Sequence, residues 1–325
     1  MATMTTADVL QVNNSEELIG LINEVIEEVP EMQFFAASPV KKNSYYTLTC
    51  TGNPTVAFRE PGTERVFETA TLANRLVECK YLDASWALER SVAQKCDWGE
   101  DFAKGLQAKT HLAAAFKAIA TQIWYGRELP GSDAGFDGFA TIIDGVVDKN
   151  GARETVVSAT DADVADGSSV FFVRTGIDSA QLAWGSSGSF VEGEIIRAPF
   201  GGKNESGDLA GAYYWTQELA AWVGLQVTSR WAAARIEKLS ATTPGAGLTD
   251  ELMYRALERF PAGVRPDAIF MSRRSLSQLR QSRTAYNPIG APVPYPTEFE
   301  GIKILTTDAI SNAETYSATG ADSGT

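Results

Sequence analysis

A long stretch of apolar residues at helical spacing, from Asp97 to Gly126, is the clearest pattern in the chain. Asp97 with Glu100 three residues later forms a capping box, and Gly126 supplies the left-handed residue that ends many helices. The pattern predicts one helix roughly 40 Å long at ~1.5 Å per residue, around which the rest of the chain is arranged. Its apolar stripe consists of Phe102, Leu106, Ala113, Phe116, Ala120 and Ile123.

A second helix is predicted near the N-terminus, over residues 15–29. Asn14 or Ser15 caps it, and Pro30 closes it. Its apolar stripe consists of Leu18, Leu21, Ile22, Val25 and Val29. Because only one face is apolar, this helix needs a partner to pack against.

Residues 41–80 lie between the two helices and contain short β-prone segments, separated by Gly/Pro turns at 51–54 and 61–64. This order predicts a hairpin-like arm. Its apolar and polar residues do not alternate for long, so the arm has no clear buried face and gains stability by lying on something else. Four charged residues surround its predicted tip: Arg59, Glu60, Glu64 and Arg65. They suit charge pairing with a neighbouring molecule, although solvated turn charges are the simpler explanation.

The middle of the chain carries mostly strand patterns. A helix from Asp83 to Cys96 and a short helix or turn around 139–143 are predicted first. Residues 154–160 and 168–175 then predict two strands joined by an acidic turn, and residues 181–200 predict one or two more.

Residues 212–239 contain the longest strand pattern. Val223, Leu225, Val227 and Trp231 fall on one parity, and Gln226, Thr228 and Arg230 fall on the other. This alternation predicts a half-buried strand that is longer than usual, and therefore an elongated domain. The Ala-rich end, residues 232–238, fits a strand or a helix.

The segment 241–247, ATTPGAG, is the best internal boundary. Beyond it we expect a helix capped at Thr249, a strand at 266–272, a second capped helix at 272–283, and a strand and turn at 301–310. Helix and strand alternate here, which predicts an α/β layer unlike the strand-rich middle. The polar tail, residues 318–325, should be frayed.

Composition is that of a soluble globular protein, with 44% hydrophobic and 21% charged residues over 325 residues. The net charge of -13 argues against a protein that wraps nucleic acid. The sequence contains neither a transmembrane-length apolar run nor a signal-peptide pattern, so we expect cytosolic synthesis and no membrane partner. Three widely spaced cysteines, Cys50, Cys79 and Cys96, indicate neither a disulfide framework nor a zinc site.

Candidate chemistry is weak throughout. His111 is the only histidine, which argues against a histidine-dependent triad or a His-rich metal site. Asp161, Asp163 and Asp166 resemble part of a calcium loop, but Phe172 stands where the bidentate glutamate belongs. The sequence around Lys203 resembles a phosphate-binding loop, but Arg197 stands where the first glycine belongs and Asn204 where Ser or Thr belongs. We therefore expect no catalytic residues, no cofactor and no metal.

Four arginines lie on the predicted helix at 272–283: Arg273, Arg274, Arg280 and Arg283. In so acidic a chain they are expected to pair with Asp or Glu of an adjacent subunit rather than with nucleic acid.

The order of these elements resembles tailed-bacteriophage major capsid proteins of the Hong Kong 97 type. The most specific segments are AYYWTQELAAWVGLQVTSRWAAARI at 212–236 and PDAIFMSRRSLSQLRQSR at 266–283, followed by FEGIKILTTDAI at 299–310. Lys303 and Ile304 stand where many relatives carry Pro-Val. In the archetype the axial segment precedes the long strands, whereas here it follows them, which suggests a permuted, podovirus-type connection.

This resemblance implies an α+β fold and a division of the chain. Residues 1–40 would be the N-terminal arm and 41–82 the extended E-loop over a neighbouring subunit. Residues 83–245 would form the peripheral domain, with the spine helix at 97–126 and with 126–185 belonging partly to the axial domain, and residues 246–317 would form the axial segment. The implied role is a self-assembling subunit of hexamers and pentamers in an icosahedral head, built in the host cytoplasm.

The implied partners are further copies of the chain, with scaffold, cement or decoration, and portal proteins. The shell would enclose double-stranded DNA without sequence-specific binding. Two alternatives stay open: an encapsulin-like compartment for cargo enzymes on the same fold, and an uncharacterised α+β hydrolase. The hydrolase predicts a compact monomer with convergent titratable residues in one pocket.

Overall fold

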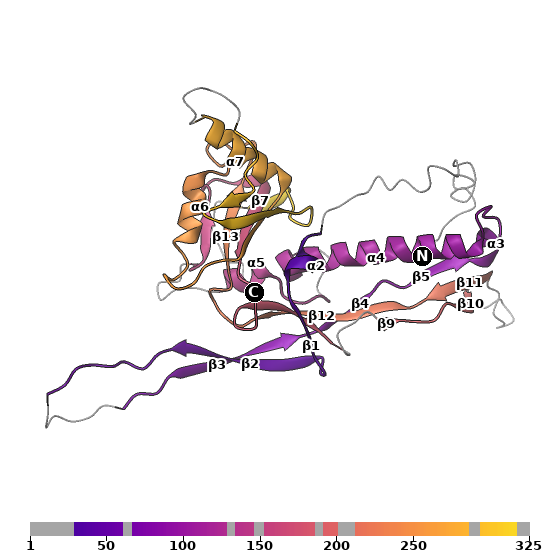
Figure 1. Ribbon diagram of the computed structural model, residues 1–325, viewed down its shortest axis with the longest axis horizontal. Coiled ribbons are helices and arrows are strands. Elements are labelled where there is room, and N and C mark those ends of the chain that lie inside the picture. The colour runs from indigo at the N-terminus through magenta and orange to yellow at the C-terminus, as the bar shows by residue number, and fades with distance from the viewer. Residues whose placement is uncertain are drawn as a thin grey trace.

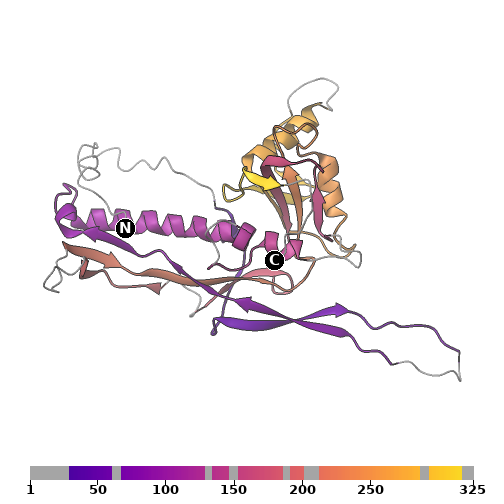
Figure 2. The ribbon, with the colours of Figure 1, turned by 180° about the vertical axis from the view of Figure 1, so that it is seen from behind.

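The computed structural model describes residues 29–60, 67–128, 134–145, 153–185, 191–200, 212–285 and 293–316. A long helix and a narrow ribbon of strands extend to one side of the molecule, and a two-stranded hairpin extends to the other (Figures 1 and 2). A lobe of strands and shorter helices stands over the middle. The predicted helix at 15–29, except for its last residue Val29, and the tail at 318–325 lie outside the described residues.

The long helix is α4, Glu100–Tyr125. Its predicted end is confirmed, because Gly126 follows it with a φ of 58°. The predicted cap at Asp97 is wrong: Gly99, with a φ of 97°, precedes the helix without a side-chain cap. The Glu100 carboxylate accepts a hydrogen bond from Trp215 Nε1 at 2.8 Å instead of taking part in the predicted capping box.

Burial along α4 is concentrated near its C-terminal end. The fully buried residues there are Ala115, Ile119, Ala120, Ile123, Trp124 and Tyr125. Ala113 of the predicted stripe is exposed, and Phe116 is only half-buried. The stripe holds at Ala120 and Ile123, where the helix meets both the ribbon and the lobe, and Phe102 and Leu106 pack against a smaller core in its first half.

The ribbon has the long segment 212–227 as its central strand. This segment consists of β11 (Ala212–Gln217) and β12 (Leu219–Val227), which are separated only at Glu218. On one side lie β8 (Ala180–Trp184), β9 (Val191–Glu192) and β10 (Ile196–Phe200), with β1 (Ala37–Pro39) beyond β8. On the other side lie β4 (Lys80–Asp83) and β5 (Trp86–Glu89). The predicted long strand is thus confirmed as far as Val227, whereas Arg230 and Trp231 lie in the turn before β13.

The prediction that this strand is half-buried is wrong. Val223 and Leu225 do pack into the cluster formed with α4, as their parity predicts. Gln226, on the opposite face, is also buried, because the base of the hairpin covers it through Tyr45. A neighbouring element therefore covers the face that sequence alone assigns to solvent.

The predicted helix from Asp83 to Cys96 is replaced by β5 followed by the short helix α3, Arg90–Ala93. Trp86 and Leu88 alternate into a small core against the first half of α4. Trp86 also pairs with Gln217 of β11 in the ribbon. Tertiary packing overrides the local helical preference here.

The lobe is built on a seven-stranded sheet within the described ranges, with strand order β15-β16-β14-β7-β13-β6 and β17 paired to β7. Its strands are β6 (Val156–Ser158), β7 (Val164–Val173), β13 (Ala233–Leu239), β14 (Ala268–Met271), β15 (Glu298–Phe299), β16 (Ile302–Thr306) and β17 (Glu314–Tyr316). Its helices are α5 (Phe139–Asp144), α6 (Asp250–Leu257) and α7 (Arg273–Ala285).

The two faces of this sheet pack against different elements. Val170 and Phe172 of β7 face a core with α6 and α7. Phe171 and Val173 face the end of α4, where the Phe171 ring stacks on Trp124 at 4.8 Å. The sheet therefore lies between the end of α4 on one face and the helices α6 and α7 on the other.

The expected elements after residue 247 are confirmed, including the cap in which Thr249 Oγ1 accepts a hydrogen bond from Leu252 N at 3.4 Å. The boundary at 241–247, however, does not separate two sheets. β13 before it and β14 after it both pair with β7. The Ala-rich end at 232–238 is the strand β13 rather than a helix.

Candidate assembly surfaces

The predicted hairpin-like arm is confirmed as β2 (Ser44–Gly52) paired antiparallel with β3 (Thr71–Glu78). One face of the hairpin contacts the ribbon. Tyr45 Oη donates to Gln226 Oε1 at 2.5 Å, and Thr49 Oγ1 donates to the Thr228 carbonyl at 2.9 Å. Burial raises the pKa of Tyr45 to about 12, so its hydroxyl stays a donor.

The other face of the hairpin is apolar and exposed. Tyr46 lies opposite Leu76, and Leu72 lies opposite Cys50. The exposed fractions are 70% for Tyr46, 63% for Leu48, 57% for Leu72 and 49% for Leu76. We call these four residues the outer face. Within the described part of the chain nothing covers them, which is typical of a surface that binds another molecule.

Farther along the arm, large apolar side chains are even more exposed: Val56 is 89%, Phe58 110% and Phe67 86% exposed. The sequence indicated an arm without a core but did not predict this outer face. The alternation of Tyr46 and Leu48 with Thr47 and Thr49 was the signal available.

The predicted tip residues are only partly described. Arg59 and Glu60 lie on the extended, exposed chain before the tip, and Arg59 Nη1 donates to the Glu60 carbonyl at 3.4 Å. Glu64 and Arg65 lie outside the described residues. Contact of these four charges with a neighbouring subunit stays a prediction.

Most of the arginines predicted on α7 have partners in their own chain. Arg283 donates two hydrogen bonds to the Asp250 carboxylate of α6, from Nε to Oδ2 at 2.9 Å and from Nη2 to Oδ1 at 2.6 Å. Arg280 donates through Nε to the Val293 carbonyl at 2.6 Å and lies 4.4 Å from the Tyr295 ring centroid. These contacts fix the helix within the lobe, and pairing of the same arginines with an adjacent subunit stays a prediction.

Arg274 is also used internally. Its Nη2 donates to the carbonyls of Asp166 and Leu239 at 2.6 and 3.2 Å. Asp166 in turn accepts hydrogen bonds from the Ser240 hydroxyl and the Ala241 amide, which lower its pKa to about 2. Of the four arginines, Arg273 at the start of α7 is the one classed as exposed.

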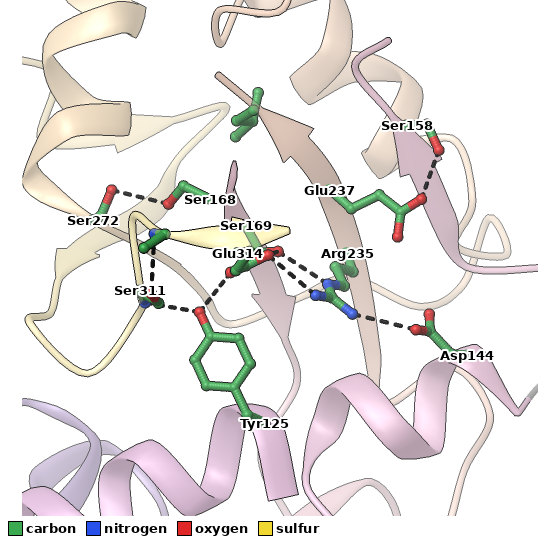
Figure 3. A network of polar contacts seen from close by, with 12 residues as sticks. Tyr125, Asp144, Ser158, Ser168, Ser169, Arg235, Glu237, Ser272, Ser311 and Glu314 are labelled. Atoms are coloured by element: carbon green, nitrogen blue, oxygen red, sulfur yellow. Dashed lines mark hydrogen bonds and ion pairs between the residues drawn. The ribbon is translucent and has the colours of Figure 1, made fainter. Parts of the chain in front are cut away.

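A buried network of charges joins the end of α4 to the lobe (Figure 3). Its centre is Arg235 of β13, only 2% exposed. Arg235 Nε donates to Ser169 Oγ at 3.0 Å, and its two terminal nitrogens lie 3.3 Å from Asp144 of α5 and from Glu314 of β17. Tyr125, the last residue of α4, donates to Glu314 Oε1 at 2.5 Å. This network, the joint, ties together five elements: α4, α5, β7, β13 and β17.

The joint continues through a second arginine. Arg153 Nη1 donates to Glu237 Oε2 at 2.8 Å and lies 3.2 Å from Asp144 Oδ1. Glu237 also accepts from Ser158 Oγ at 2.7 Å. Burial raises the pKa of Asp144, although Arg235 and Arg153 beside it act in the opposite direction. Sequence reasoning missed the joint, because its members are scattered from Tyr125 to Glu314.

Grooves border the hairpin. One groove of about 420 Å³ lies between β3, β12 and α5, and it holds the ion pairs Arg127–Asp137 at 3.1 Å and Lys80–Glu78 at 2.6 Å. His111 lies half-buried on α4, away from its lining residues. Among the described residues there is no cluster of three metal-ligating side chains, and no described helix is long and apolar enough to cross a membrane.

Comparison with known proteins rests on structure. No protein-family model and no curated protein sequence matches the chain. A chain from a structure of bacteriophage Epsilon15 is similar, with a TM-score of 0.68, 14% identity and 98% coverage of both chains. A chain from the capsid of bacteriophage JBD30 decorated with minor capsid protein trimers is similar at a TM-score of 0.53 and 14% identity, covering 96% of this chain and 99% of that one. The predicted α+β fold is thus confirmed, because the chain shares it with a chain of the Epsilon15 structure and with one of the JBD30 capsid.

Proposed function

We propose that this protein is a major capsid protein that assembles, as hexamers and pentamers, into an icosahedral bacteriophage head around double-stranded DNA. The fold shared with the Epsilon15 and JBD30 chains supports this role. At 14% identity those similarities concern the fold, so the argument for function rests on this chain's own surfaces.

The outer face of the hairpin is the observation that carries the proposal. A two-stranded hairpin is at best marginally stable alone, and this one reaches away from the body with Leu48 and Leu72 more than half exposed. Covering that face with a neighbouring copy removes apolar area from water and stabilises both the arm and the contact. A contact between different surfaces of identical chains closes into rings when the rotation fits, as in hexamers and pentamers.

The net charge of the chain supports a shell that encloses DNA without binding it as a ligand. The net charge of -13 disfavours adhesion to a polyanion, so a shell of such subunits holds DNA without sequence-specific binding. The role is structural rather than catalytic. Its place is the virion capsid, after assembly in the host cytoplasm.

Further partners follow from the same role. The JBD30 capsid is described as decorated with minor capsid protein trimers. We extend to this chain a cement or decoration protein of that kind, together with a scaffold and a portal protein.

Negative-stain electron microscopy of the expressed chain, after gel filtration, tests the proposal. Closed shells or ring-shaped capsomers are the expected result. A uniform monomer of about 35 kDa at every concentration, without assembly under any salt condition, would contradict it.

A further inference from the structure

The side chain of Glu31 is fully buried at the point where the described chain begins. Glu31 opens the short helix α2, Glu31–Phe34, and has an exposed fraction of 0%. Its Oε1 accepts hydrogen bonds from Trp124 Nε1 at 2.7 Å and from Thr307 Oγ1 at 2.5 Å. One carboxyl oxygen therefore connects α2 to the end of α4 and to the loop after β16.

The other oxygen, Oε2, has no hydrogen-bond partner among the described residues. Next to Glu31 in the chain, Phe34 and Phe35 pack on the Phe270 ring, with centroids 5.1 and 6.1 Å apart. A carboxylate with a bare oxygen in such surroundings is costly, whereas a neutral carboxyl group is tolerated.

The charges around Glu31 do not offset this cost. The element α4 presents the neutral Trp124, and the neighbouring Tyr125 is directed to Glu314 instead. The loop after β16 contributes Thr307 and the acid Asp308, whose charge disfavours a second negative charge. Desolvation is the main cause that raises the pKa of Glu31 above its ordinary value of 4.5.

We propose that Glu31 is a proton-dependent latch, in which the neutral carboxyl group holds α2 against the end of α4 and ionisation weakens that attachment. The segment affected, residues 29–40, leads through β1 into the hairpin. The latch therefore controls how firmly the start of the hairpin arm is held to the body. It acts within one chain and does not require the proposed shell.

The linkage between protonation and docking determines in which direction pH changes the stability of docked α2. Glu31 has a higher pKa when α2 is docked than when it is released, so the docked form is fully favoured below the ordinary pKa and loses stability as pH rises. One proton is involved, so the ratio of released to docked α2 increases by at most about tenfold per pH unit between the two pKa values. Above the docked pKa the ratio levels off.

Hydrogen exchange on the full-length chain measures this ratio, at one assembly state set by gel filtration. The reporting amides are Phe34 and Phe35, which donate to the carbonyls of Pro30 and Glu31 at 3.1 and 3.0 Å. Protection factors, corrected for the intrinsic effect of pH on exchange, are followed from about pH 4 to about pH 9. Amides of α6 serve as the reference for global opening.

In the wild-type chain the protection of Phe34 and Phe35 should fall as pH rises, with a slope of at most one proton, while α6 stays constant. Glu31→Gln keeps an acceptor for Trp124 and Thr307 but cannot ionise, so its protection should be independent of pH and at least equal to wild type at high pH. Flat wild-type protection over the whole range overturns the latch. An identical slope in Glu31→Gln overturns it as well, because another group would then be titrating.

Discussion

The outer face of the hairpin gives the sharpest test of assembly. The double variant Leu48→Thr and Leu72→Thr makes this face polar while keeping residues that suit a strand. Both side chains are exposed in the single chain, so the hairpin should keep its fold. In the proposed shell both are buried by a neighbouring copy, so the loss falls on the contact between subunits.

The size of that loss follows from the exposed fractions. Fully burying a leucine side chain is worth about 1.5–3 kcal/mol. Leu48 is 63% and Leu72 57% exposed, so each has about 1–2 kcal/mol still to gain on assembly. The pair together amounts to about 2–4 kcal/mol, which weakens each contact by roughly 30- to 700-fold.

Light scattering against protein concentration, checked by electron microscopy, measures the threshold for assembly. We expect the threshold to rise by at least the factor calculated for one contact, because each subunit in a ring takes part in more than one. Ile177→Thr is the matched control, since Ile177 is 73% exposed but lies off the hairpin. If the double variant has an unchanged threshold and normal shells, the outer face is not a subunit contact.

Three further outcomes are expected. Arg235→Ala removes a guanidinium from Glu314, whose side chain is 9% exposed, and from Asp144, which keeps Arg153. It should lower the free energy of unfolding in urea by about 3 kcal/mol, more than Arg235→Leu combined with Asp144→Asn and Glu314→Gln. Gly126→Ala would place Cβ 2.0 Å from a backbone nitrogen at a positive φ, so this variant should unfold at a much lower temperature. Gly105 in α4 has open space around it, so Gly105→Ala should raise the free energy of unfolding by roughly 1 kcal/mol. Reversing the charges of Arg59 and Glu60 should impair shell formation without changing the circular dichroism of the subunit; normal shells would argue against docking of the arm near its tip.

Local signals explain which elements could be predicted from the sequence. Thr249 caps α6 and Gly126 ends α4 because each residue determines the backbone in its own neighbourhood. The long central strand was predictable for the same reason, since alternation of Val223 and Leu225 with polar residues needs only the pleat.

Non-local contacts explain what could not be predicted. Glu100 looked like a capping residue, but Trp215, which is 115 positions away, takes its carboxylate. Nothing in the sequence indicated that α6 brings Asp250 within 2.6 Å of Arg283. The side of a strand or helix that meets a partner depends on the fold as a whole, and a single sequence does not record it.

The attachment of the hairpin has a mechanical consequence. Tyr45 and Thr49 bind the ribbon near the base, whereas Glu60 lies 11 positions beyond Thr49, roughly 36 Å away at ~3.3 Å per residue. A rotation of the hairpin by about 5° about its attachment at Tyr45 and Thr49 moves Glu60 by roughly 3 Å at that length. Small angular adjustments at two hydrogen bonds thus become displacements as large as an atom's diameter at the tip. One chain can in this way meet neighbours at different inclinations without refolding its body.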